Sequence, residues 1–293
     1  MCGQGKRGSQ SRRLRAVVAL FLAAVLLSSL AGCSPISAVK GWLDPQSNQA
    51  VATLTPKIKP PTIHEAGKLA IGVNLGMAPF ASKTATGYEG FDIELGKTLA
   101  KHLGLEPVFV AVTPDTMVEA LDSNKVDIAL SASVDTTGVV VAQSYYQDTQ
   151  VLFAQSGEAS RVAATPQLPK TALQAGSAVE SMLKGSMSSS DASGTLQLYP
   201  TLSEAIQAVE KKQAVAVAGD YSILRYAQLG GVKIDFVRPL STENPDRGVA
   251  IRADNLELMR VMKPLMVQLD ETGALASIMR TWIGDDQLAA AMD

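Results

Sequence analysis

The chain has 293 residues, of which 46% are hydrophobic, so it is long enough to fold around one large core or two smaller ones. Its formal net charge is −2 and only 5% of its residues are aromatic, a composition that argues against a nucleic-acid partner. With two histidines, two cysteines and no GxSxG or HExxH motif, the sequence predicts no catalytic residue, no metal site and no cofactor.

The N-terminus has the order of features found in secretory signals. Basic residues up to Arg15 precede an apolar run over residues 16–30, which is shorter than the roughly 20 apolar residues of a membrane-spanning helix. The last residue of the run begins the sequence Leu-Ala-Gly-Cys at residues 30–33, which resembles the lipobox of bacterial lipoproteins. This resemblance implies a signal peptide over residues 1–32 and a lipid on the Cys33 thiol, which would anchor the chain at the extracytoplasmic face of the cell membrane. The paired arginines at residues 12–13 leave the export route open between the general and the twin-arginine pathway.

Removal of the signal would change the charge and leave one thiol. Five of the 26 Lys and Arg residues, but none of the 28 Asp and Glu residues, precede Cys33, so the mature chain has 21 basic against 28 acidic residues, a net charge of about −7. Cys33 would be its sole cysteine, which excludes an intramolecular disulfide. Residues 33–67 hold five prolines among polar side chains and have no sustained periodicity, which predicts a lipidated, semi-extended tether.

Alternating strands and helices begin at Lys68. Short apolar runs predict strands, and apolar residues at four-residue spacing predict helices with one apolar face. The expected strands are residues 69–74, 107–112 and 126–131, and the expected helices are residues 90–103 and 116–121. This alternation predicts a parallel sheet covered by helices.

A second unit of the same kind follows, and the boundary between the two is expected near residues 150–156. The expected strands are residues 171–174, 196–199, 214–218, 232–237 and 248–251, and the expected helices begin at Ser177 and cover residues 202–211, 256–269 and 274–283. The serine-rich stretch over residues 186–191 is expected to be a mobile loop. Two α/β units of similar size predict two lobes.

Six short motifs occur in one order along the folded part of the chain. They are GVN (72–74) with PF (79–80), GFDIEL (90–95), NKVDI (124–128), YY (145–146), QAGS (174–177) and TWIG (281–284). In this order and spacing the chain resembles the family 3 solute-binding proteins of ABC importers, the class that binds polar amino acids. The resemblance implies a periplasmic-binding-protein-like α/β fold of the Venus-flytrap type II, with two α/β lobes joined by two crossing segments. It also implies that residues 68–150 form lobe I, residues 151–245 form lobe II, and residues 246–293 return to lobe I.

Polar groups at strand ends and helix N-termini are the candidate ligand-binding residues. Asp220 directly follows an apolar strand, where its carboxylate can bind a ligand ammonium, and the family places its amine-binding Asp at this position. Backbone N–H groups at Gly176 and Ser177, at the start of a helix, can bind a carboxylate, although Ser177 also suits a plain helix cap. The resemblance adds four residues that follow the first and third strands: Asn74, Met77, Ser131 and Ser133.

One feature of the family is missing. Members that bind α-amino acids carry an Arg a few residues beyond the third strand, and residues 134–141 hold none. Three alternatives therefore remain open. The solute is an amine without an α-carboxylate; or Arg247, otherwise a solvated surface residue, or the Ser177 helix end binds the carboxylate; or the domain is a ligand sensor or scaffold without a transport function.

These observations predict a monomeric substrate-binding lipoprotein of an ABC importer. It would capture a small polar, amine-bearing solute by closing about hinges near residues 150–156 and 239–246, and its further partners would be the membrane permease and the lipid bilayer. A cleft-carboxylate enzyme, using Glu180 or Asp220, is a remote alternative.

Overall fold

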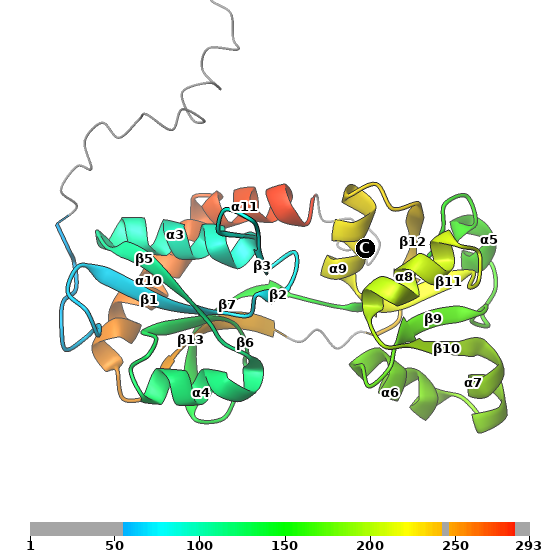
Figure 1. The fold of residues 1–293 in the computed structure, drawn as a ribbon, viewed down its shortest axis with the longest axis horizontal. Helices are drawn as coiled ribbons and strands as arrows, with labels where there is room; N and C mark the ends of the chain where they lie inside the picture. Colours follow the sequence, from blue (N-terminus) through cyan, green and yellow to red (C-terminus); the bar gives the residue numbers. More distant parts are fainter. Residues whose placement is uncertain (1–54, 242–245, 285–293) are drawn as a thin grey trace, which may run out of the picture. The chain divides into compact units, whose positions relative to one another are not determined.

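The computed structural model describes residues 55–241 and 246–284. The predicted signal peptide (1–32), the predicted lipid attachment at Cys33 and the tether up to residue 54 lie outside the described residues. The described chain forms two five-stranded sheets, each with helices on both faces, and a small three-stranded sheet (Figure 1). Among the described residues, no helix is long and apolar enough to cross a membrane.

The first sheet is built mainly from the N-terminal half of the folded chain. Its strand order is β5 (Glu106–Ala111), β1 (Lys68–Val73), β6 (Ile128–Ser133), β13 (Asp246–Arg252) and β7 (Val139–Gln147). Strands β1, β5 and β6 are parallel, and β13 runs antiparallel between β6 and β7. The three strands predicted from apolar runs are therefore confirmed as a parallel set.

Helices cover both faces of this sheet and complete the first lobe. Helices α3 (Phe91–Leu103), α10 (Leu256–Glu271) and α11 (Ala274–Trp282) pack on one face, and α4 (Pro114–Asp122) packs on the other (Figure 1). The apolar face predicted for α3 is confirmed, because its apolar residues at four-residue spacing are all buried. Strand β13 thus brings the chain back into the sheet of its N-terminal half.

The second sheet repeats this arrangement and forms the second lobe. Its strand order is β10 (Leu196–Tyr199), β9 (Thr171–Gln174), β11 (Ala216–Asp220), β8 (Gln150–Gln155) and β12 (Ile234–Pro239). Strands β9, β10 and β11 are parallel, and β8 runs antiparallel between β11 and β12. In each lobe, three parallel strands are followed by an antiparallel pair.

In the described part of the chain, five helices cover the second sheet. Helices α8 (Leu202–Glu210) and α9 (Tyr221–Leu229) pack on one face, and α5 (Ala159–Ala163), α6 (Ala178–Ser186) and α7 (Ser189–Thr195) pack on the other. Figure 1 shows α8 and α6 on opposite sides of the strands. Because both faces are covered, β8 is buried except at its last residue. Val151 and Phe153 join the core under α8 and α9, while Leu152 and Ala154 join the core of α5, α6 and α7.

The small sheet lies between β1 and α3 in the sequence. It is formed by β2 (Gly76–Met77), β3 (Ala81–Lys83) and β4 (Tyr88–Glu89), none of which the sequence predicted. Gly90, which follows β4 directly, has φ +130, and a Cβ there would collide with the backbone oxygen of Phe80. The glycine of the GFDIEL motif is therefore required by a close approach of two backbones.

The predicted tether is wrong at its C-terminal end. Ile58 and Ile63 are 5% and 1% exposed and belong to the core of the first lobe. The Lys57 N–H donates a hydrogen bond to the Leu103 carbonyl at 2.9 Å, and the His64 N–H donates one to Asp127 Oδ1 at 2.7 Å. Residues 57–67 thus belong to the folded body, because two apolar side chains among the prolines anchor them.

Two further expectations are wrong. Residues 150–155 of the segment expected as a hinge form strand β8, and the link between β7 and β8 is Asp148 and Thr149. The serine-rich stretch expected as a mobile loop contains the start of α7, where the Ser188 hydroxyl accepts a hydrogen bond from the Asp191 N–H at 3.1 Å. A serine at this position satisfies a helix N–H that would otherwise have no partner.

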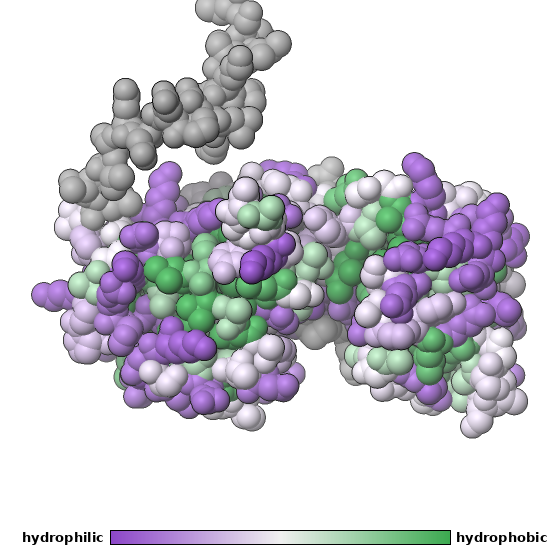
Figure 2. Space-filling model, viewed as in Figure 1, coloured by the Kyte–Doolittle hydropathy of each residue, from purple (hydrophilic) through white to green (hydrophobic). Residues whose placement is uncertain are grey.

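The face of the molecule seen in Figure 2 is mostly polar, with apolar patches. Figure 2 shows apolar groups between polar ones over the strands of both sheets. Val108 on β5 and Leu198 on β10 are 37% and 44% exposed, and both lie on edge strands. Isolated exposed residues of this kind are ordinary on a folded surface.

Candidate functional site

The candidate residues lie at the carboxyl ends of the parallel strands. In the first sheet, Ser133 ends β6 and pairs in register with Arg247, the second residue of antiparallel β13. In the second sheet, Asp220 ends β11 and pairs with Gln150, the first residue of β8. Loops at this edge of an open α/β sheet are the usual place for a ligand.

Three charged side chains meet where the chain passes between the sheets. Arg247 Nη2 lies 3.4 Å from Asp148 Oδ2 and 3.8 Å from Asp220 Oδ2. Asp148 belongs to the β7–β8 link, Asp220 to the end of β11 and Arg247 to the start of β13. The group, which we call the Arg247 cluster, therefore joins the first lobe, a crossing segment and the second lobe.

Asp148 is the buried member of the cluster. Its side chain is fully buried, and it accepts hydrogen bonds from the Ser222 hydroxyl at 2.7 Å, the Ser222 N–H at 3.2 Å and the Thr149 N–H at 3.1 Å. Burial and the nearby Asp220 carboxylate raise the pKa of Asp148, and the bonds from Ser222 and the charge of Arg247 oppose this shift. Asp148 therefore ties the crossing segment to the first turn of α9.

Asp220 is the more accessible carboxylate, with its side chain 30% exposed. It occupies the N-cap position of α9, yet its side chain makes no capping hydrogen bond there. Its Oδ1 accepts a hydrogen bond from Gln150 Nε2, and its Oδ2 faces Arg247 at 3.8 Å. The alternative role as a helix cap is thus absent, and the carboxylate retains acceptor capacity.

Arg247 is not the solvated surface residue that the sequence favoured. Its side chain is 18% exposed, its guanidinium carbon lies 4.7 Å from the centre of the Phe80 ring, and Nη1 lies 3.3 Å from Met77 Sδ. Stacking over an aromatic ring stabilises a guanidinium that leaves bulk water. Its Nε is buried and finds no hydrogen-bond acceptor within the described parts of the chain.

A hydrogen-bonded network connects α3, β6 and β7. Asp92, which is fully buried, accepts hydrogen bonds from Tyr145 Oη and Ser131 Oγ, each at 2.7 Å, and the Ser131 N–H donates to Tyr145 Oη at 2.6 Å. Burial raises the pKa of Asp92 to about 6, against the lowering effect of the Tyr145 and Ser131 hydrogen bonds. Ser131 has φ +56, so the network holds an uncommon backbone conformation beside the candidate site.

The helix start at Gly176 and Ser177 is not free. The Gly176 N–H donates a 2.5 Å hydrogen bond to Glu180 Oε2, and the Glu180 N–H donates to Ser177 Oγ at 3.3 Å. Lys184 Nζ donates to Glu180 Oε1 at 2.5 Å, and this bond lowers the pKa of Glu180. The expectation of a free N–H at Gly176 is wrong, because a carboxylate of the same helix already binds it.

The structure brings together some predicted residues and leaves others apart. Met77 and Asp220 contact Arg247, and Ser133 lies opposite it in the sheet. Asn74 instead bonds within its own turn, where Oδ1 accepts from the Gly76 N–H at 3.3 Å. Gly176 and Ser177 have no hydrogen bond or ion pair with the Arg247 cluster among the described contacts.

Sequence reasoning missed Asp148 and Phe80 as neighbours of the site. Phe80 belongs to the PF motif, which could have indicated it, whereas Asp148 stands alone between two strands and has no local signal. Within the described ranges, no group of three or more His, Cys, Asp or Glu side chains is placed to hold a metal ion.

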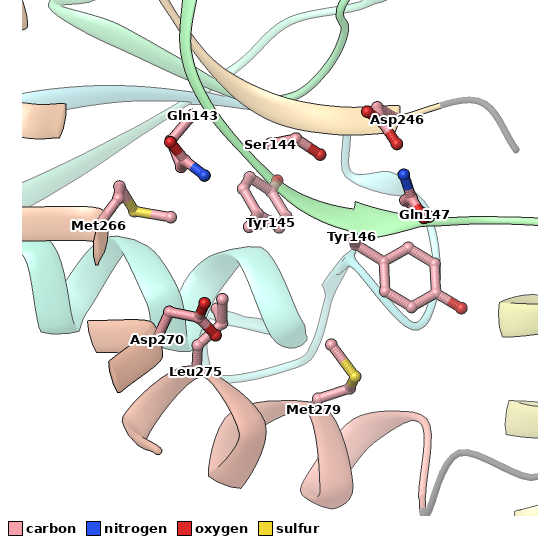
Figure 3. A pocket seen from close by; sticks show the side chains of 10 residues that line it. All are labelled: Gln143, Ser144, Tyr145, Tyr146, Gln147, Asp246, Met266, Asp270, Leu275 and Met279. Atoms are coloured by element: carbon pink, nitrogen blue, oxygen red, sulfur yellow. The ribbon is translucent and has the colours of Figure 1, made fainter. Parts of the chain in front are cut away.

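A separate cavity of about 390 Å³ lies within the first lobe, between β7 and the helices α10 and α11. Figure 3 shows Tyr146 and Asp246 on one side of it and Met266 and Asp270 on the other. It contains none of the predicted site residues.

The folded part of the chain has known relatives. Residues 69–285 match the family model of the bacterial extracellular solute-binding proteins, family 3. The chain is 21% identical over 240 residues to the L-cystine-binding protein TcyJ of Escherichia coli K12, covering 76% of this chain and 85% of TcyJ. It is 24% identical over 221 residues to the arginine-binding extracellular protein ArtP of Bacillus subtilis, covering 73% of this chain and 86% of ArtP.

Solved structures of the same fold extend this likeness. An ancestral cationic amino acid solute binding protein superimposes with a TM-score of 0.63 at 24% identity, covering 74% of this chain and 96% of that chain. The expected fold, two α/β lobes of the type II periplasmic binding proteins, is thereby confirmed. Because the family model also spans most of the sequence, the chain belongs to family 3 of the bacterial extracellular solute-binding proteins.

Proposed function

We propose that this protein is the substrate-binding lipoprotein of an ABC importer and captures a small polar, amine-bearing solute, an amino acid or a related compound. Its relatives are solute-binding proteins named for L-cystine and arginine, both of which carry an α-ammonium group. Membership of family 3 supports an amino-acid solute at an extracytoplasmic location.

The observation that carries the proposal is the state of Asp220. Its carboxylate stands at the end of β11, is 30% exposed and does not cap α9. An ammonium group placed against it would gain a charge-assisted hydrogen bond, which is roughly twice as strong as a neutral one. Met77 and Ser133, which lie beside Arg247, would line the remainder of the site, and Asn74 and Ser131 would flank it.

Capture would proceed by closure of the two lobes. The chain crosses between the sheets at Asp148–Thr149 and again between β12 and β13, where residues 242–245 of the expected second hinge lie outside the described residues. These two links would act as the hinge segments. A solute that contacts groups of both lobes binds the closed form better and shifts the population towards it. The permease would then recognise the closed form.

Membrane attachment would be supplied by Cys33. A diacylated cysteine followed by a short linker to residue 57 would keep the binding domain near the permease. Radiolabelled palmitate should be incorporated into the wild type and not into Cys33→Ser.

Mass spectrometry of small molecules retained through purification tests the proposal. The expected result is an amino acid or a related amine that is present with the wild type and depleted from Asp220→Asn. The alternative, a sensor or scaffold of the same fold, rests on the missing Arg over residues 134–141. It would be favoured if no solute is retained and no member of a broad solute library raises the melting temperature.

A further inference from the structure

The Arg247 guanidinium is held in place but not saturated. A guanidinium has five N–H donors, and charge-assisted hydrogen bonds to carboxylates are normally about 2.7–2.9 Å long. Here the nearest carboxylate oxygens are 3.4 and 3.8 Å away, Nη1 faces only the sulfur of Met77, and Nε is buried without an acceptor among the described residues. Several donors therefore remain for a further acceptor.

The two carboxylates of the cluster use at most the Nη2 group of Arg247, and neither is placed to accept from Nε or Nη1. Asp148 is fully buried, accepts three hydrogen bonds from Ser222 and Thr149, and receives from Arg247 Nη2 one long hydrogen bond of 3.4 Å. Asp220 belongs to the second lobe and holds Gln150 through its other oxygen. Phe80 covers one face of the guanidinium, with 4.7 Å between the guanidinium carbon of Arg247 and the centre of the ring. A further acceptor must therefore approach Arg247 from another side.

The arrangement matches the geometry of an α-amino acid. Its ammonium and carboxylate groups are attached to the same carbon, so the protein groups that bind them must be close neighbours. Asp220 and Arg247 are 3.8 Å apart and carry the two complementary charges. The other candidate for the carboxylate, the helix start at Gly176, is occupied by Glu180 at 2.5 Å.

We propose that Arg247 binds the carboxylate of the solute beside Asp220, so that the site selects α-amino acids over amines that lack a carboxylate. This inference rests on the proposed function and names the residue that sets its specificity. The carboxylate would be bound from the strand that returns to the first lobe, not from the segment after the third strand. An amine without a carboxylate would bring a second cation beside Arg247 and leave its donors unpaired, which costs binding free energy.

The test compares each amino acid with its decarboxylated counterpart. Arginine and agmatine, lysine and cadaverine, histidine and histamine, and cystine and cystamine are titrated calorimetrically into the wild type, Arg247→Gln, Arg247→Lys and Arg252→Gln. Arg252 is the matched control, because it lies at the other end of β13 and pairs with Asp254 and Asn124. Thermal melts identify the folded variants, and Arg247→Lys retains the charge if the Gln variant is unstable.

The wild type should bind the amino acid of at least one pair at least tenfold more tightly than the amine. Arg247→Gln should lower the affinity for the amino acid by about ten- to a hundredfold and leave the affinity for the amine nearly unchanged. Arg247→Lys should lose part of this discrimination, because an ammonium does not bind a carboxylate in the bidentate manner, and Arg252→Gln should behave as the wild type.

If the ratio of the affinities for the amino acid and the amine is unchanged in both Arg247 variants, the role of Arg247 is overturned and the proposed function still stands. Equal affinity of the wild type for both members of every pair that binds would do the same. Absence of binding of every compound of these pairs to the wild type would overturn the inference, and absence of binding of all the standard amino acids as well would overturn the proposed function.

Discussion

Replacing Asp92 by Asn should make the stability of the protein depend less on pH. Asp92 is fully buried, and burial raises its pKa from the ordinary 3.8 to about 6. The folded state therefore holds this proton more tightly than the unfolded state does. The resulting stabilisation is fully present below about pH 3.8 and is lost as the pH rises through about 6.

The magnitude follows from the size of the shift. A shift of roughly two units corresponds to about 3 kcal/mol at 1.36 kcal/mol per unit, so between about pH 4 and pH 7.5 the wild type should lose about 2 to 3 kcal/mol through this group. Asn is similar in shape, can accept from Tyr145 Oη through its carbonyl and can donate to Ser131 Oγ. It therefore removes the titration with little change in packing.

Urea denaturation of the wild type, Asp92→Asn and Asp122→Asn at several pH values measures this effect. Asp122 is an exposed carboxylate at the end of α4 and controls for the loss of one surface charge. Relative to the wild type, Asp92→Asn should gain about 2 to 3 kcal/mol between pH 4 and pH 7.5, and Asp122→Asn should not. If Asp92→Asn followed the pH profile of the wild type, Asp92 would not be the buried titrating group described here.

Three further changes test other parts of the structure. Ile63→Ala should lower the free energy of unfolding, measured by chemical denaturation, by about 2 to 5 kcal/mol, because truncation of a 1% exposed side chain leaves a cavity. A loss below about 1 kcal/mol would contradict the assignment of residues 57–67 to the folded body. Gly248→Ala should lower the melting temperature, since its Cβ would collide with Val141 and lie 2.7 Å from the Gln143 carbonyl, and an unchanged melting curve would contradict this packing. Cys33→Ser should move the protein from the membrane to the soluble fraction after cell breakage, and retention in the membrane would contradict lipid anchoring.

Much of the fold could be predicted because its signals are local. The βαβ alternation and the four-residue spacing of apolar residues in α3 lie in continuous stretches of sequence, and β9 and β10 begin and end where the apolar runs do. Strand β8 was missed because a strand buried on both faces has no alternation and resembles any short apolar run. Ile58 and Ile63 were missed because two isolated apolar residues among prolines have no period, and their burial depends on contacts with distant elements.

The residues of the candidate site likewise differ in whether a local sequence signal indicates them. The position of Asp220 after a strand can be read from the sequence, although its role as ammonium ligand stays a prediction. The occupation of Gly176 by Glu180 also had a local signal, since Ser177 and Glu180 have the spacing of a capping box. The Arg247 cluster had none, because Arg247 and Asp148 are 99 residues apart in the chain and meet only through the antiparallel strands at the crossing.

Calorimetric titration of the purified protein and of Asp220→Asn with the standard amino acids and cystine is the most direct test of solute capture. At least one amino acid should bind the wild type saturably, and Asp220→Asn should weaken that binding by about tenfold or more. Equal affinity of the variant, or no binding of any amino acid to the wild type, would contradict the account of Asp220 as the ammonium-binding group of an amino-acid receptor.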